Sequence, residues 1–342
     1  SMPTPVETYP WHEAAWAALN DCRGRGRLPH ALLIDGPAGI GRHAFARRIA
    51  AALLCARSED GSGDACGTCP ACRQFAAGSH PDFSHLRLLR KGESIGSDRL
   101  KQDATRIRID QVRELGHTLA MSAGHGGWKV ALVDPADLMV PAAANALLKT
   151  LEEPTPRTLL LLVAARRGDL LPTIRSRCQR LSLNPPSPGE ARDWLAARGL
   201  GDVESLLAMA DGAPLRALEL AGEGWVELRG EAFEAFAGVV TGRQDPLRVA
   251  ASWSAGETET LLAWLGGWLV DMIRLKQSLP REGLDNRDLA DRMQALVEHI
   301  ELSALFTRLD AWRRARRLVT TQVNTQLLCE ELLLAWRPSG SS

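Results

Sequence analysis

The stretch Ala31–His43 reads ALLIDGPAGIGRH and decides the fold class. Its first five residues are an apolar run that stops at Gly36, as a buried strand of a parallel sheet does. A loop with three glycines follows, and a helical pattern begins near His43. A strand, a glycine-rich loop and a helix in this order predict an α/β domain with a parallel sheet and a phosphate-binding loop (P-loop).

The glycine loop lacks the residues that complete its motif. Gly36, Gly39 and Gly41 keep the framework, but the last two positions are Arg42 and His43 where a P-loop has Lys and then Ser or Thr. Arg is a planar fork, not a compact point charge, and neutral His is a poor ligand for Mg²⁺, which prefers oxygen. The alternative, a chance glycine turn, is disfavoured by the flanking strand and helix. We therefore predict a P-loop fold whose ATP binding is doubtful.

A second predicted strand, residues 129–134, ends in an acid. Asp134 stands at the Walker-B position, where an Asp holds Mg²⁺. The next residue is Pro135, which cannot act as a base toward water, and Asp137 lies three residues on, where we expect it to point elsewhere. With Arg42 and His43, three chemical roles are compromised at once, which argues against ATP turnover.

Four of the seven cysteines cluster within 18 residues, a spacing typical of a metal site in a reducing compartment. They are Cys55, Cys66, Cys69 and Cys72, and the two-residue gaps let thiolates reach one ion. Four thiolates with no open position predict a structural Zn²⁺ site. His80 is the alternative to Cys55 as the fourth ligand, and a redox role is disfavoured because no thioredoxin-like pattern surrounds the cluster.

Several further segments have clear patterns. Residues 109–121 predict an amphipathic helix with Asp110 as its N-cap, and residues 158–165 predict a third buried strand. Residues 91–106 are polar, and we expect a mobile loop there. After the prolines at 185, 186 and 188 no convincing strand follows, and residues 189–342 read as successive amphipathic helices.

Composition narrows the class of protein. The chain has 342 residues, with 41 Lys and Arg against 41 Asp and Glu, so its formal net charge is zero. A neutral chain does not bind nucleic acid or an anionic membrane through bulk charge. No apolar run reaches the ~18 residues of a membrane span, and residues 1–10 lack the pattern of a signal peptide. We expect a cytoplasmic protein that does not contact a membrane.

Four motifs in order carry a resemblance. They are Leu28-Pro29-His30-Ala31-Leu32-Leu33 before the glycine loop, the four cysteines, Ala143-Ala144-Asn145-Ala146-Leu147-Leu148-Lys149-Thr150-Leu151-Glu152-Glu153-Pro154, and Ile174-Arg175-Ser176-Arg177-Cys178. With these four motifs in this order, the chain resembles the delta-prime family of bacterial DNA polymerase III clamp-loader subunits, which are AAA+ proteins. The resemblance implies an AAA+ α/β domain over residues 1–185 with a zinc module at 55–72. An all-α lid over 186–225 and an all-α collar, the oligomerisation domain, over 226–342 would follow.

The same resemblance assigns a role to Ser176-Arg177-Cys178. In clamp loaders this Arg reaches the γ-phosphate of ATP on a neighbouring subunit, so Arg177 would be an arginine finger supplied in trans. The alternative from composition alone is a solvated basic patch of Arg175, Arg177 and Arg180. Two departures from ATPase relatives stand out: the position of a polar sensor residue is Ala164, and Arg216 falls one position late for a second sensor.

Three functional hypotheses follow. The first is a non-catalytic (stator) subunit of a clamp-loading heteropentamer. Its partners would be the ATPase subunits, the delta subunit, the sliding clamp and, through the complex, primed DNA. The second is an active clamp-loader ATPase in which Arg42 replaces the P-loop lysine. The third is a free-standing zinc-containing module that binds nucleic acid, which the neutral charge disfavours.

Overall fold

The computed structural model describes residues 6–57, 63–95, 97–121, 123–124, 126–165, 167–201, 203–319 and 324–337. The chain divides into two compact units, Ser1–Pro186 and Ser187–Ser342. The division of the helical half into a lid and a collar at residue 225 stays a prediction. No helix in the described ranges is long and apolar enough to cross a membrane.

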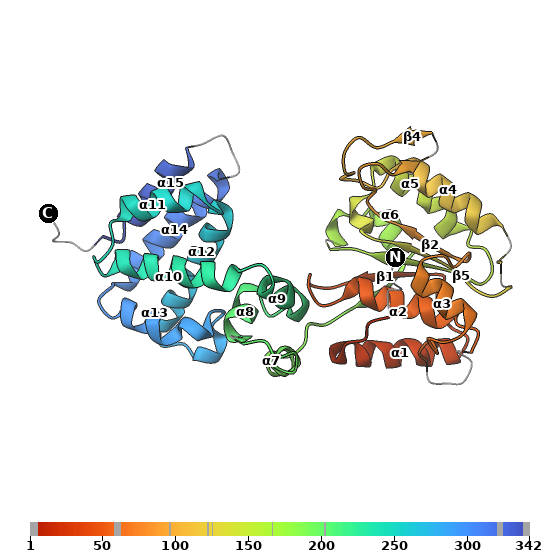
Figure 1. Cartoon of the computed structure of the whole chain (residues 1–342), viewed down its shortest axis with the longest axis horizontal. Helices are drawn as coiled ribbons and strands as arrows, with labels where there is room; N and C mark the ends of the chain where they lie inside the picture. The colour runs from red at the N-terminus through yellow and green to blue at the C-terminus, as the bar shows by residue number, and fades with distance from the viewer. Residues whose placement is uncertain are drawn as a thin grey trace. The chain divides into compact units, whose positions relative to one another are not determined.

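A five-stranded parallel sheet forms the centre of the first unit (Figure 1). Its strands are β1 (Ala31–Asp35), β2 (Phe83–Leu86), β5 (Lys129–Val133), β6 (Thr158–Val163) and β7 (Gln179–Ser182). They lie in the order β2-β5-β6-β1-β7. Every residue of β1, β5 and β6 is buried, because helices cover both faces of the sheet. The α/β fold class is confirmed.

Helices flank this sheet on both faces, with α2 on one face and α4 and α5 on the other (Figure 1). The helices and 3₁₀ turns are η1 (Pro10–His12), α1 (Glu13–Gly24), α2 (Arg42–Leu54), α3 (Pro70–Ala77), α4 (Ile109–Ala120), η3 (Ala136–Leu138), α5 (Pro141–Glu152), η4 (Arg167–Asp169) and α6 (Pro172–Arg175). The predicted N-cap of α4 is wrong. The cap is Arg108, because the side chain of Gln111 accepts the Arg108 backbone N–H at 3.0 Å and starts the helix before Asp110.

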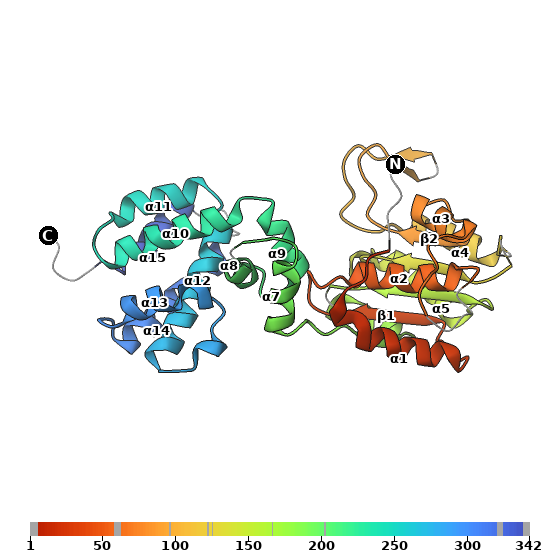
Figure 2. The same ribbon diagram turned by 60° about the horizontal axis from the view of Figure 1, so that its bottom comes forward.

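The segment expected to be a mobile loop contains an ordered hairpin. Strands β3 (Ser94–Ile95) and β4 (Asp98–Arg99) pair antiparallel, and the hairpin extends away from the sheet (Figure 2). At its base Glu93 accepts two hydrogen bonds from Arg87, at 2.9 and 2.5 Å. These bonds, with one from the Arg90 backbone, lower the pKa of Glu93 to about 2.

The order of the strands brings the candidate nucleotide-site residues to one edge. Strand β6 lies between β1 and β5, and all three run parallel. Their carboxyl ends therefore meet at the same edge of the sheet, where ligands bind in open α/β folds. The glycine loop follows β1, Ala164 follows β6, and Asp134 follows β5.

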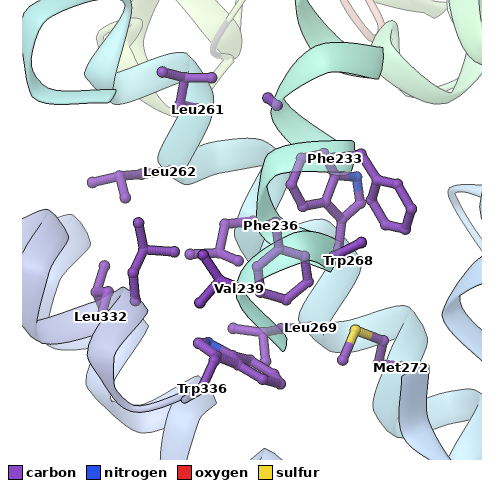
Figure 3. Packing of buried hydrophobic residues seen from close by; sticks show 14 of the residues in the cluster. Phe233, Phe236, Val239, Leu261, Leu262, Trp268, Leu269, Met272, Leu332 and Trp336 are labelled. Carbon is purple, nitrogen blue, oxygen red and sulfur yellow. The ribbon is translucent and has the colours of Figure 1, made fainter. Parts of the chain in front are cut away.

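The second unit is helical in every described element. Its elements are α7 (Pro188–Ala196), α8 (Val203–Met209), α9 (Pro214–Ala221), α10 (Trp225–Val240), α11 (Pro246–Ala255), α12 (Thr258–Lys276), η5 (Arg281–Gly283), η6 (Arg287–Leu289), α13 (Ala290–Val297), α14 (Leu302–Leu318) and α15 (Thr325–Leu334). Aromatic rings fill the core (Figure 3): Trp268 lies 5.1 Å from Phe233 and 5.7 Å from Phe236, centroid to centroid. Trp336 of the C-terminal segment packs edge-on against Phe236 at 5.0 Å.

A buried polar network joins the predicted lid to the predicted collar within this unit. Arg229 on α10, which is 2% exposed, donates to both carboxylate oxygens of Asp288, at 2.8 and 3.1 Å. Ser205 on α8 donates to the same carboxylate at 2.7 Å. Removing one partner of such a buried pair leaves an uncompensated charge, so this network favours one fixed arrangement of α8 against α10.

Candidate functional site

The glycine loop between β1 and α2 accepts only glycine at two positions. A side chain at Gly36 would place its Cβ 2.7 Å from the carbonyl oxygen of Leu183. At Gly41, with φ of 88°, a Cβ would lie 2.9 Å from the Tyr9 ring. Gly39 also has a positive φ, of 77°. The loop therefore requires glycine at these positions, and protein atoms pack closely on it.

Aromatic residues of the N-terminal segment contact the glycine loop. The indole Nε1 of Trp11 donates to the carbonyl of Ile40 at 2.8 Å. The Nε2 of His12 lies 2.7 Å from the same oxygen and must donate, because a carbonyl only accepts. Burial lowers the pKa of His12. The sequence pattern gave no signal that this segment binds the loop.

Arg42, at the position of the P-loop lysine, is engaged by the protein itself. Its guanidinium donates from Nη1 to the carbonyl oxygen of Ala164, at the end of β6. Ala164 is the residue at the predicted sensor position. The one cation of the loop therefore bonds to the sheet edge, where a P-loop lysine would point at phosphate oxygens.

Asp134, at the Walker-B position, is paired with a histidine. The Nδ1 of His43 lies 2.5 Å from the Asp134 carboxylate. His43 therefore stands beside the carboxylate at the place where Mg²⁺ would bind. Asp137 accepts the Ala165 backbone N–H at 3.4 Å. Arg42, His43 and Asp134 thus lie at the same edge of the sheet, where Arg42 bonds to Ala164 and His43 pairs with Asp134. The sequence did not reveal these two contacts.

A second histidine lies beside this pair. The His85 ring on β2 is 5.3 Å from the His43 ring. Burial, with a smaller effect of the His43 charge, lowers the pKa of His85 to about 4. The neighbouring Asp134 raises this pKa, whereas Arg87 and Arg47 lower it further. His85 is therefore neutral at pH 7.

We expect His85 to make stability dependent on pH. An unfolded histidine has a pKa near 6.5, above the folded value of about 4, so its contribution is present above pH ~6.5 and is lost as the pH falls toward 4. Between pH 7 and pH 5 the resulting decrease in the free energy of unfolding is about 2 kcal/mol. When denaturant unfolding is measured at the two pH values, the free energy of unfolding should fall less for His85→Gln than for the unsubstituted chain. The control is His117→Gln on the exposed face of α4, and equal losses in all three proteins would contradict the assignment.

The four predicted cysteine ligands lie together. All four Sγ atoms are within 4.8 Å of one another, with Cys55–Cys69 at 4.0 Å and Cys66–Cys72 at 3.9 Å. A tetrahedral ion with Zn–S of ~2.3 Å needs sulfur separations of about 3.8 Å. Hydrogen bonds from Thr68 and Cys69 lower the pKa of Cys66 to about 5, which favours the thiolate that binds metal. The donor set fits a structural zinc ion.

His80, the alternative fourth ligand, is used differently. Its Nδ1 accepts the backbone N–H of Asp82 at 3.1 Å. Cys55, at the end of α2, lies with the other three thiols, and its sulfur accepts backbone N–H groups of Arg57 and Cys66 at 3.4 and 3.3 Å. The geometry favours Cys55 over His80.

The zinc module is fastened to α1 and α2 by a buried arginine. Arg48 on α2 is 3% exposed and donates to both oxygens of Asp64, at 2.7 and 2.9 Å. It also donates to Glu13 of α1 at 2.9 Å, and its guanidinium lies 4.1 Å from the centre of the Trp16 ring. Asp64 precedes Cys66 by two residues. The position of the cysteine loop and that of α1 are therefore coupled.

Arg177 lies between α6 and β7, on the surface of the first unit. Its side chain is 36% exposed, and its Nη2 lies 2.8 Å from the Glu152 carboxylate. Its Nη1 donates to the Thr173 carbonyl at 2.9 Å. Nearby Arg180 pairs with Asp35 at 2.8 Å, so Arg177 and Arg180, two of the three arginines in the alternative of one solvated patch, have distinct partners. Arg216, in the second unit, pairs with Glu219 at 2.9 Å.

Comparison with known proteins adds independent information. Residues 11–187 match the family described as "DNA polymerase III, delta subunit", and residues 223–338 match "DNA polymerase III, delta subunit, C terminal". A Pseudomonas aeruginosa protein named DNA polymerase III subunit delta′ is 36% identical over 97% of this chain and 98% of its own length. The Escherichia coli protein of the same name is 32% identical over 95% of this chain and 94% of its own length. A Thermotoga maritima gamma subunit-related structure covers 94% of this chain and 98% of its own at 19% identity, with a TM-score of 0.43.

Proposed function

The chain belongs to the DNA polymerase III delta′ family, and on that premise we propose that it is a non-catalytic (stator) AAA+ subunit of the clamp loader. It helps load the sliding clamp on primed DNA. Its partners are the ATPase subunits and the delta subunit of a heteropentamer in the cytoplasm. Its chemical contribution is Arg177, supplied in trans to ATP bound by a neighbouring subunit.

The state of the chain's own nucleotide site carries this proposal. Arg42 bonds to the Ala164 carbonyl and His43 pairs with Asp134, so ATP and Mg²⁺ would have to break both contacts. Neither Pro135 nor Asp137 is placed to activate water, because proline has no basic group and Asp137 accepts the Ala165 N–H. In contrast, Arg177 is on the surface, and some of its N–H donors have no partner among the described residues.

An arginine finger acts by electrostatics. A fixed guanidinium neutralises negative charge that builds up on the equatorial oxygens during phosphoryl transfer. Its planar fork suits two phosphate oxygens at once, which a lysine cannot match. This role needs an ordered and accessible arginine at a subunit surface, and Arg177 meets both conditions.

The zinc module has a structural role in this proposal. Cys55, Cys66, Cys69 and Cys72 would hold Zn²⁺, which supplies cross-linking and no chemistry, because four thiolates leave no open position. Through Asp64 and Arg48 the module fixes α1. The segment that contacts the glycine loop directly precedes α1.

The test of the damaged site uses the purified chain and the assembled loader. We expect the chain alone to show neither ATP binding in equilibrium dialysis nor ATP hydrolysis. We also expect a loader built with Arg42→Gln and His43→Gln to keep its ATPase within about twofold, once thermal unfolding shows the variant folded. Hydrolysis by the chain alone that Arg42→Gln abolishes would support the alternative, an active ATPase with a degenerate P-loop.

A further inference from the structure

Glu152 is the last residue of α5 and contacts Arg177 directly. Its carboxylate lies 2.8 Å from Nη2 of Arg177, and the side chain is about half exposed. The second terminal nitrogen, Nη1, donates to the Thr173 carbonyl at 2.9 Å and lies 3.4 Å from the Ser176 hydroxyl. The guanidinium is therefore anchored at both of its terminal nitrogens, by α5 on one side and α6 on the other.

The position of Glu152 is unfavourable without a cation beside it. The last turn of a helix carries the negative end of the helix dipole, where an acidic side chain is disfavoured and a cation is favoured. Glu152 is followed directly by Glu153, a second acid. Arg177 supplies the positive charge that offsets this arrangement. The pair is therefore favourable to both residues, and each holds the other in place.

The anchoring leaves part of the guanidinium available. Arginine has five N–H donors, and the bonds to Glu152 and Thr173 use one on each terminal nitrogen. Nη1 also donates to the Ser176 hydroxyl at 3.4 Å, so the Nε–H and the second N–H of Nη2, which have no partner among the described residues, remain for an anion. A free arginine loses rotamer entropy on becoming ordered. An arginine that is already held loses less when the anion arrives.

We propose that Glu152 is a positioning residue for Arg177: together with the Thr173 carbonyl, it orders the guanidinium before the neighbouring subunit's nucleotide reaches it. This inference rests on the proposed trans role of Arg177. Glu152 touches no substrate and acts only through the arginine.

The test measures ATP hydrolysis by a reconstituted loader with sliding clamp and primed DNA. We expect Glu152→Ala to lower kcat at the site that Arg177 serves by about threefold to tenfold, the range open to a partly exposed ion pair that positions a reacting group. KM for ATP should be unchanged, and the total rate of the loader should fall by less than it does with Arg177→Ala. Glu152→Gln keeps an acceptor oxygen and should recover at least half of the loss. Glu153→Ala removes the neighbouring acid of the same helix end and should behave as the unsubstituted protein.

A double-substitution cycle separates this inference from the function on which it rests. Adding Glu152→Ala to Arg177→Ala should cause no further loss, because the residue acts only through the arginine. If Arg177→Ala lowers the rate but Glu152→Ala leaves it unchanged or raises it, the positioning role is wrong and the proposed function stands. If Arg177→Ala itself leaves the rate unchanged, the proposed function fails and this inference fails with it.

Discussion

We expect removal of the proposed Zn²⁺ from the four-cysteine site to unfold residues 63–72, which contain Cys66, Cys69 and Cys72. The small core around this segment consists of Cys55, Cys69, Ala71 and Cys72, with Ala65 packed beside it. Three of these four buried residues are the ligands themselves, so the loop before α3 has little other apolar surface to hold it without an ion. Phe75 on α3 packs separately, against Phe83 at 4.8 Å. Structural zinc contributes roughly 10 kcal/mol or more to such small sites.

Metal analysis and hydrogen exchange measure this effect. We expect one zinc per chain in the unsubstituted protein, and loss of the metal in Cys69→Ser, whose ligand is 2% exposed. Backbone amides of residues 63–72 should then exchange at least a hundredfold faster. The matched control is Cys22→Ser, which removes a partly buried thiol outside the cluster. Unchanged exchange in a zinc-free Cys69→Ser chain would show that the segment folds without the metal.

The effect should extend to the N-terminal segment. Without the cysteine loop, Asp64 no longer holds Arg48, and Glu13 is the one ionic partner left to this buried guanidinium among the residues that the structure describes. Loss of one partner of a buried pair is costly. Residues 6–24 should therefore exchange faster as well, while strands β1, β5 and β6 remain protected.

Local patterns were enough to predict the framework. The run Ala31–Asp35, the glycines after it and the strand that ends at Asp134 are each set by neighbouring residues in the sequence, because a buried parallel strand needs a continuous apolar run. The spacing of Cys66, Cys69 and Cys72 is likewise local. These features were found where the sequence placed them.

Contacts between distant residues could not be predicted. The ion pair of Arg177 with Glu152 joins residues 25 apart, and Trp11 bonds to Ile40 across 29. No pattern in the sequence pairs them, because each depends on how α5, α6 and η1 pack in three dimensions. The wrong N-cap of α4 had a different cause: Asp110 is a good capping residue, but the Gln111 side chain reaches the backbone one turn earlier.

Substitution of Arg177 by Ala is the second large effect that we expect. An arginine finger is worth 10³–10⁵ in the rate of phosphoryl transfer at the site it serves. The rate of ATP hydrolysis at the neighbouring subunit should therefore fall by at least about a hundredfold. The total rate of the loader should fall by the fraction of the activity that this one site contributes. Arg177→Lys should recover little of the lost rate, because lysine has no planar guanidinium group that can contact two phosphate oxygens at once.

Binding of ATP should change much less than hydrolysis. The finger acts on charge that develops in the transition state, so the affinity of the assembled complex for ATP should stay within about tenfold. Assembly should also persist, because Arg177 bonds only to surface groups of its own unit and its exposed ion pair contributes little to stability. Size-exclusion chromatography of the complex provides this control.

The most direct test of the account is ATP turnover by the reconstituted loader, with clamp and primed DNA, containing either the unsubstituted chain or Arg177→Ala. The account predicts that the chain alone hydrolyses no ATP. It also predicts that the Arg177→Ala complex assembles but loses a large part of the ATPase activity of the unsubstituted complex. Equal turnover by the two complexes would contradict the account and leave Arg177 as a surface charge.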